Sequence, residues 1–267
     1  MNRRGFTLIE LLVVIAIVGI LSSVIYSNIT GIRDRARITA GIRFDSSTLH
    51  SIGDQLVGEW TFDSPNLPLI DTSGFGNTGT CTACPTYATT SGYNNKGTYD
   101  LNGTSHYIEI STSLIIPTGD FTYTAWVKLD TNNDEVIFMA AGGGNEFLFS
   151  ISTLVGIVYT NDILRLTGKT VIPTGTWAHM AATRAGSVMK LYVNGKEDGT
   201  GTDGGVLNFS TCPLLIGVDV DTGCVGSLGN YFNGYVDDLR VYSSALSGSD
   251  IQKLYVEGLP LHEVAAK

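Results

Sequence analysis

The pattern of apolar and polar positions divides the chain into two parts with different periods. Residues 6–26 are apolar or small except for Glu10. As a helix, these 21 residues would be about 31 Å long, which matches the roughly 30 Å hydrocarbon core of a bilayer. A secretory signal peptide would instead have a shorter apolar stretch that ends in a small-residue cleavage site. The pattern therefore predicts a transmembrane helix over residues 6–26.

A helical period continues beyond this apolar run. The apolar residues that share one helical face are Ile29, Ile32, Ala36, Ile42, Leu49, Ile52 and Leu56. No proline lies between Met1 and Asp63, so nothing in this stretch forces a helix to end. We therefore expect one long helix over residues 6–56.

From about Leu56 onward, short apolar runs alternate with turn residues. These runs are rich in β-branched and aromatic residues, which is typical of strands; they are EWTF, HYIEI, FTYTAWVKL, EVIFMAA, EFLFSIS, VGIVYT, TWAHMAATR, MKLYV and YVDDLRVY. Asn194-Gly195 lies between two apolar runs and indicates a two-residue hairpin turn. The spacing of the turns predicts a two-sheet antiparallel sandwich, and about 200 residues suffice for one core.

Charge separates the same two parts. Residues 1–43 carry six arginines and two acidic residues, which leaves ten basic and 23 acidic residues, a net charge of −13, for residues 44–267. This acidity argues against nucleic acid as a partner of the C-terminal part. Arginines lie on both sides of the apolar run, so charge alone does not orient the predicted span.

The first residues resemble the class III signal of type IV pilins and pseudopilins. The resemblance rests on Arg3, Arg4 and Gly5 followed by the string Phe6 to Glu10. It implies that prepilin peptidase removes a leader, residues 1–5, by cleaving between Gly5 and Phe6, and that Phe6 is then N-methylated. It also implies a single-pass protein of the bacterial cytoplasmic membrane that later joins other pilin subunits in an extracellular or periplasmic filament.

The resemblance gives Glu10 a role. A carboxylate in a membrane helix is costly unless it is paired. In a filament of parallel helices, Glu10 is expected to bind the Phe6 amine of a neighbouring subunit. The alternative is that Glu10 lies near the membrane interface and is solvated.

The C-terminal part resembles LamG-like, concanavalin A-like jelly rolls. Seven stretches carry the resemblance in order: Gly58 to Asp63, Asp71 to Gly79, Asp100 to Ile110, Phe121 to Val127, Trp177 to Arg184, Lys190 to Gly195 and Phe232 to Leu246. It implies a jelly-roll domain over residues 57–257, followed by a tail, residues 258–267. About a dozen strands in two sheets and a concave face that binds glycans or proteins are expected.

The jelly-roll resemblance also implies a structural calcium ion. Its expected ligands are Asp237 first, then Asp63 and the stretch of Gly76 and Asn77. Calcium takes six to eight oxygens from carboxylates and loop carbonyls. The alternative for Asp237 is a salt bridge to Arg184 or Arg240, because a buried carboxylate needs a partner.

All four cysteines lie in the part expected outside the cytoplasm, where disulfides are favoured. The grouping favours the local pairs Cys81-Cys84 and Cys212-Cys224 among three connectivities. Zinc is the rival interpretation of Cys-x-x-Cys, although the second pair lacks a ligand-like spacing.

The sequence does not indicate an enzyme. Glucanases of this architecture carry paired carboxylates on one strand, whereas Glu109, Glu135 and Glu146 each stand alone and are expected to face solvent. The four histidines are scattered, and His179 is expected to be a satisfied residue of the sandwich.

Two functions remain open. The first is a pilin-like subunit that displays a glycan- or protein-binding head for adhesion. The second is a purely structural pilin, or a pseudopilin of a type II secretion system. Exposed aromatic side chains in a groove would favour the first, and Tyr93, Tyr159 and Tyr231 are the sequence's candidates.

Overall fold

The computed structural model describes residues 52–110, 119–142, 145–207, 212–220 and 227–263, all within one compact unit, residues 48–267. The predicted transmembrane helix, with Gly5, Phe6 and Glu10, lies outside the described residues. Among the helices that are described, none is long and apolar enough to cross a membrane.

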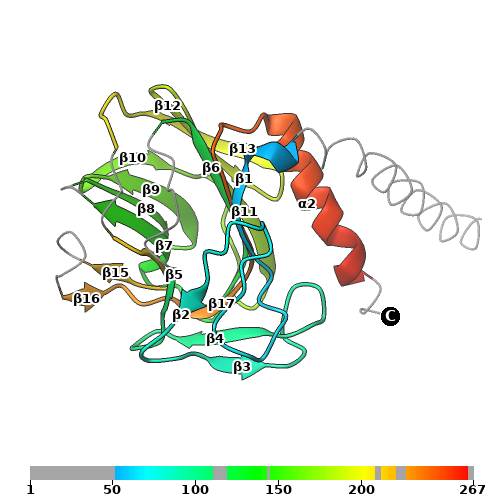
Figure 1. Ribbon diagram of the computed structural model, residues 1–267. Coiled ribbons are helices and arrows are strands. Elements are labelled where there is room, and N and C mark those ends of the chain that lie inside the picture. Colours follow the sequence, from blue (N-terminus) through cyan, green and yellow to red (C-terminus); the bar gives the residue numbers. More distant parts are fainter. Residues whose placement is uncertain (1–51, 111–118, 143–144, 208–211, 221–226, 264–267) are drawn as a thin grey trace, which may run out of the picture. The chain divides into compact units, whose positions relative to one another are not determined.

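The described unit is a sandwich of two antiparallel sheets (Figure 1). Sheet A has the strand order β13-β12-β11-β6-β17-β4-β3, and β1 pairs with β17 beside β4. Its strands are β1 (Leu56–Trp60), β3 (Thr86–Ala88), β4 (Thr98–Asn102), β6 (Phe121–Leu129), β11 (Trp177–Ala185), β12 (Val188–Val193), β13 (Lys196–Thr202) and β17 (Asn233–Tyr242).

Sheet B has the strand order β10-β9-β8-β7-β14-β5-β2. Its strands are β2 (Gly79–Thr80), β5 (Ile108–Ile110), β7 (Glu135–Gly142), β8 (Asn145–Ser152), β9 (Val155–Thr160), β10 (Ile163–Thr167) and β14 (Leu214–Ile216). A separate two-stranded ribbon pairs β15 (Asp219–Val220) with β16 (Leu228–Gly229).

The predicted strands and hairpin are confirmed. Eight of the nine apolar runs form a strand or the greater part of one, whereas EWTF contributes only Glu59 and Trp60 to the end of β1. Asn194 and Gly195 have φ values of 50° and 74°, and they join β12 to β13 with Val193 opposite Lys196. Both residues therefore adopt the left-handed conformation that a type I′ turn requires.

The main hydrophobic core fills the space between the sheets. Its largest fully buried side chains include Trp60, Phe121, Tyr123, Phe138 and Phe147. Burying each such side chain contributes about 1.5 to 3 kcal/mol relative to leaving it exposed. These aromatic residues alternate with outward-facing residues along their strands, which fixes which face of each sheet lies outside.

A C-terminal helix covers the outer face of sheet A. Helix α2 (Gly248–Glu263) packs Ile251 and Leu254 against Ala181, Tyr192 and Tyr242 of the sheet. Figure 1 shows α2 lying along this side of the sandwich. One outer face of the sandwich is thus covered by the chain itself.

The boundaries of the head differ from the expected ones at both ends. The 3-10 helix η1 (Gly53–Gln55) is followed directly by β1, so Leu56 is a strand residue paired with Tyr242 rather than the end of a long helix. Residues 258–263, expected in a tail, belong to α2. Leu56 packs against the cluster formed by α2 and sheet A. Periodicity shows only that a residue is buried on one face, so it cannot tell this strand residue from the last residue of a helix.

Candidate ligand-binding site

The outer face of sheet B carries apolar side chains that no helix of the described residues covers. Alternation along β8 places Phe147 and Phe149 in the main core and Leu148 on the outside. A bulge in β7 between Val136 and Phe138 leaves Val136 and Met139 both on this outer face. The outer face of sheet B therefore has an apolar floor of its own.

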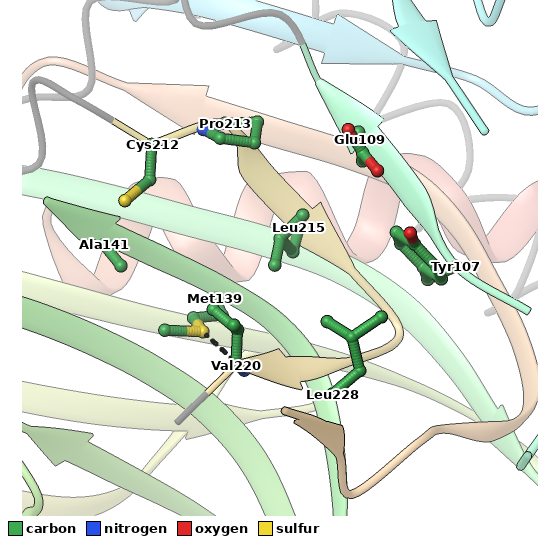
Figure 2. A pocket seen from close by; sticks show the side chains of 9 residues that line it. All are labelled: Tyr107, Glu109, Met139, Ala141, Cys212, Pro213, Leu215, Val220 and Leu228. Atoms are coloured by element: carbon green, nitrogen blue, oxygen red, sulfur yellow. Dashed lines mark hydrogen bonds between the residues drawn. The ribbon is translucent and has the colours of Figure 1, made fainter. Parts of the chain in front are cut away.

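One part of this floor is a hollow of about 260 Å³, which we call the apolar hollow. Figure 2 shows its side chains coming from β5, β7, β14, β15 and β16 and from the segments beside them. The backbone N–H of Val220 donates a hydrogen bond to Met139 Sδ at 3.3 Å, which ties β15 to β7. The lining residues are Tyr107, Glu109, Met139, Ala141, Cys212, Pro213, Leu215, Val220 and Leu228.

Tyr107 and Glu109 give this hollow a polar rim. Burial raises the pKa of the Tyr107 hydroxyl, and a hydrogen bond to the Glu109 carboxylate raises it further. Tyr231 lies close enough to contribute to the same shift. Two tyrosines and a carboxylate beside an apolar floor offer a ring surface together with hydrogen-bonding groups.

A second hollow, of about 230 Å³, lies on the same face, and we call it the acidic hollow. Strand β15 separates the two, because Val220 lines the apolar hollow and Asp219 lines the acidic one. The lining residues are Asp134, Glu135, Val136, Glu146, Leu148, Ser150, Ile151, Ile157, Tyr159, Asp162, Asp219 and Asn230.

Glu146 is held in this hollow by the β9–β10 turn. Asn161 and Asp162 form the turn with φ values of 51° and 58°, and the Asp162 N–H donates to Glu146 Oε1 at 2.7 Å. Burial, together with the negative charges of Asp162 and Asp219, raises the pKa of Glu146 from its ordinary 4.5 to about 7.

This shift predicts a pH dependence of stability. Because the folded pKa of Glu146 lies above its unfolded value, its stabilising contribution is complete below about pH 4.5 and is lost as pH rises through about 7. Between pH 5 and pH 8, we expect the parent head to lose more melting temperature than Glu146→Gln does. Calorimetric melting of both proteins at the two pH values measures this difference, and equal losses would contradict it.

A second group of carboxylates lies on sheet A at a bulge in β17. Between Asp237 and Arg240, β17 has one residue more than its partner β6, and Asp238 has a φ of 47°. The bulge coincides with the point where the neighbour of β17 changes from β4 to β1. As a result, both carboxylates contact Tyr93: its N–H donates to Asp237 Oδ2 at 3.1 Å, and its hydroxyl donates to Asp238 Oδ2 at 3.4 Å.

The two carboxylates have different electrostatic surroundings. Arg240 binds Asp238 at 3.2 Å and Glu59 at 2.9 Å, so the expected salt bridge from Arg240 goes to Asp238 rather than to Asp237. Asp237 is fully buried, and burial together with the charge of Asp238 raises its pKa well above the ordinary value. The other expected partner, Arg184, donates hydrogen bonds to backbone carbonyls.

Part of the predicted calcium set lies together here. Asp63 accepts hydrogen bonds from Asn94 at 3.0 Å and Lys96 at 2.7 Å, in the loop that also contacts Asp237. A Cβ placed on Gly92 would lie 2.8 Å from Asp237 Oδ2 and within 3.0 Å of two loop carbonyl oxygens. Calcium at Asp63 and Asp237 stays a prediction.

Gly76 and Asn77 have a different role in the structure. The Asn77 side chain donates to Asp71 Oδ2 at 2.9 Å and to the carbonyl of Val57 at 3.0 Å, and Asp71 also accepts the N–H groups of Glu59 and Ser73. Asp71 therefore holds this glycine-rich loop by hydrogen bonds. Within the described residues, no three acidic, histidine or cysteine side chains are grouped to hold a metal ion.

The cysteines agree with the expected local pairing as far as they are described. Cys81 and Cys84 form a disulfide with a Cα–Cα distance of 5.0 Å. Cys212 is also disulfide-bonded, and its expected partner, Cys224, lies outside the described residues.

Several other side chains differ from expectation. Tyr93 is only 6% exposed, because its ring stacks on Trp126 at 4.7 Å. Glu135 is 2% exposed rather than solvent-facing, and it accepts hydrogen bonds from Thr131 and from the backbone N–H of Asn233. The prediction that Glu135 faces solvent was wrong, because it rested on short-range alternation. The position of Glu135 depends instead on the bulge in β7 and on Asn233 of β17, which is distant in sequence.

The remaining candidates lie partly as expected. Tyr159 and Tyr231 are half-buried and pack on the outer floor of sheet B. Glu109 and Glu146 reach the surface at the rims of the two hollows. His179 is a buried residue of the sandwich, but its Nδ1 has no hydrogen-bond partner in the described part of the chain, and burial lowers its pKa to about 3.

Comparison with known proteins agrees with both resemblances. Residues 102–252 match the family described as the Concanavalin A-like lectin/glucanases superfamily. Residues 1–26 match the prokaryotic N-terminal methylation motif, the class III signal of pilins. No curated protein sequence matches the chain.

Solved structures share the sandwich at low sequence identity. Domain 4 of AbnA, an extracellular GH43 arabinanase from Geobacillus stearothermophilus, solved with arabinotriose, is 23% identical with a TM-score of 0.56; the match covers 75% of this chain and 98% of that one. The binding domain of Paraclostridial Mosquitocidal Protein 1 is 16% identical (TM-score 0.57), with 76% and 52% covered. The binding domain of botulinum neurotoxin serotype C1 is 15% identical (TM-score 0.59), with 78% and 53% covered. The chain thus spans about half the length of these two toxin domains.

Proposed function

Because the chain belongs to the Concanavalin A-like lectin/glucanases superfamily and begins with an N-terminal methylation motif, we propose that it is a pilin-like filament subunit whose head binds a glycan. The subunit is made as a single-pass protein of the cytoplasmic membrane, is processed by prepilin peptidase and joins an envelope filament. The head then attaches the filament to a surface. It acts as a binding module rather than as an enzyme.

The observation that carries this proposal is the asymmetry of the sandwich. Helix α2 covers the outer face of sheet A, whereas the outer face of sheet B carries two hollows with an apolar floor. Concave sites with apolar walls and a few polar groups are typical of small-ligand binding. The solved complex of AbnA domain 4 with arabinotriose supports a saccharide as the ligand class.

The purely structural function remains the second candidate. A pilin or a type II secretion pseudopilin that only packs against its neighbours has no need of a hollowed face with half-buried tyrosines. Binding measurements on the isolated head therefore separate the two functions.

We expect a Tyr107→Ala head to lose about tenfold in affinity for its glycan, because the ring forms one wall of the apolar hollow. The experiment screens residues 48–267 against a glycan array and then titrates the best glycan calorimetrically. Tyr235→Ala is the matched control, since Tyr235 is a half-buried tyrosine on the opposite sheet, under the Lys128 ammonium.

The two variants give opposite results if the assignment is right. Tyr107→Ala weakens binding while Tyr235→Ala retains the parent affinity. If no glycan on the array binds the parent head, the proposed function is wrong. If Tyr235→Ala is the weaker variant, the binding face is on sheet A.

A further inference from the structure

We propose that the acidic hollow binds the protonated amine of an amino sugar, an inference that rests on the glycan-binding function proposed for the same face. The apolar hollow on the other side of β15 would then hold the next part of the saccharide chain.

The first observation is a hydroxyl group that lacks a partner. Ser150 is 4% exposed, its side chain lines the acidic hollow, and its Oγ has no hydrogen-bond partner within the described residues. Leaving a buried hydroxyl unpaired is unfavourable, so such groups indicate a missing partner. A ligand that reaches the floor of the hollow would supply this partner.

The second observation is the charge of the walls. Every charged residue that lines the hollow is acidic, and no lysine, arginine or histidine is among the lining residues. The acids come from several segments: Asp134 and Glu135 at the start of β7, Glu146 on β8, Asp162 in the β9–β10 turn and Asp219 on β15. This arrangement attracts a cation.

The cation that fits is an ammonium group rather than a metal ion. Three acidic side chains grouped to hold a metal are not found in the described part of the chain. An ammonium group instead carries three N–H donors and tolerates mixed acceptors. Glu146 and Asp219 provide carboxylate oxygens for it, whereas Ser150 lies four residues further along β8, where its hydroxyl would meet a hydroxyl group of the same sugar.

The floor of the hollow suits the carbon skeleton of a sugar. Cross-strand pairing places Leu148 opposite Tyr159 and Ser150 opposite Ile157, so the hydroxyl lies between an aromatic ring and aliphatic walls. The volume of about 230 Å³ is below the roughly 300 to 1,000 Å³ typical of pockets for drug-sized ligands. One sugar ring, rather than a longer chain, therefore fits this hollow.

Binding should also displace a proton. Asp162 and Asp219 are the charged neighbours of Glu146, and Asp134 and Glu135 line the hollow at the other end of β8; the pKa of about 7 leaves Glu146 mostly protonated at pH 6. An amine is cationic at pH 6 and favours the ionised carboxylate. Binding of the amine therefore releases a proton from Glu146, whereas an acetylated sugar releases none.

The test compares the glucosamine trimer with its N-acetylated trimer by calorimetry at pH 6 in buffers of different ionisation enthalpy, using residues 48–267. We expect the free-amine trimer to bind about tenfold or more tightly than the acetylated one. Asp219→Asn should reduce this preference, Ser150→Ala should weaken the binding of both trimers, and Glu146→Gln should abolish the proton release. Asp54→Asn is the matched control, because it removes one exposed charge far along the chain from the hollow and should change neither result.

Each other outcome overturns a defined part of the argument. Equal binding of the two trimers, or proton release that persists in Glu146→Gln, overturns the amine assignment but leaves the glycan function standing. Displacement of the amine by calcium, with the same proton release, shows a metal site instead. Failure of both trimers overturns the amine assignment, and only failure of the whole glycan array overturns the proposed function.

Discussion

A Glu10→Ala protein is expected to enter the membrane and lose its leader, yet to be almost absent from filaments. Removing a carboxylate from the predicted span lowers the cost of insertion, and the bond between Gly5 and Phe6 is unchanged. In the filament, the Phe6 amine of the neighbour would lose its partner. Breaking a buried pair by removing one member costs about 3 to 5 kcal/mol, which corresponds to more than a hundredfold in assembly.

A Gly5→Leu protein should fail one step earlier, with the leader, residues 1–5, still attached. The mature mass and the filament content of each variant, expressed beside the parent, distinguish processing from assembly. A Glu10→Ala protein that assembles as well as the parent would show that the carboxylate is only a solvated residue at the membrane interface.

Calcium is expected to raise the melting temperature of the head, residues 48–267, by roughly 5 to 11 °C. A ligand at a hundred times its dissociation constant adds about 2.7 kcal/mol to the stability of the folded state. For a domain of this size, each kcal/mol corresponds to roughly 2 to 4 °C. The physical reason is that Asp237 is buried beside Asp238, and a divalent cation would stabilise its ionised form.

Two variants locate this effect. Asp237→Asn should remove the calcium response, whereas Asp219→Asn, in the acidic hollow of the other sheet, should retain it. Melting curves with a chelator and with millimolar calcium measure the shift. Identical curves for the parent under both conditions would show that the Asp237 site binds no calcium. A response that is lost only in Asp219→Asn would show that calcium binds in the acidic hollow of sheet B.

Prediction from the sequence was most successful where the pattern is local. Strands β6, β11 and β17 were found because short runs rich in β-branched and aromatic residues lie between turn residues, and the β12–β13 hairpin was found because Asn-Gly favours positive φ. Strand β13, in contrast, has the sequence KEDGTGT, which has no apolar side chain and two glycines. It is a strand because it pairs with β12 along its whole length. The formation of a strand depends on such neighbours as well as on the residues of the strand itself.

The candidate sites were less predictable. The adjacent acids Asp237 and Asp238 attracted attention in the sequence, but the bulge that brings both to Tyr93 depends on where β17 changes partner. Asn77 was assigned to the same ion site, whereas its hydrogen bonds hold the loop of Asp71. The acidic hollow was not predicted as one site, since its members are distributed from Asp134 to Asn230.

The sequence by itself determined the N-terminal processing motif, the class of the head and most of its strands, because these depend on neighbouring residues and on periods of two or three to four. The tertiary structure alone decided that α2 covers one outer face, that the other face is hollowed, and that Ser150, whose hydroxyl has no partner among the described residues, lines the same hollow as Glu146 and Asp219. Such features depend on the register between strands that are distant in sequence. Register is set by the packing of the whole core, and no short stretch of the chain encodes it.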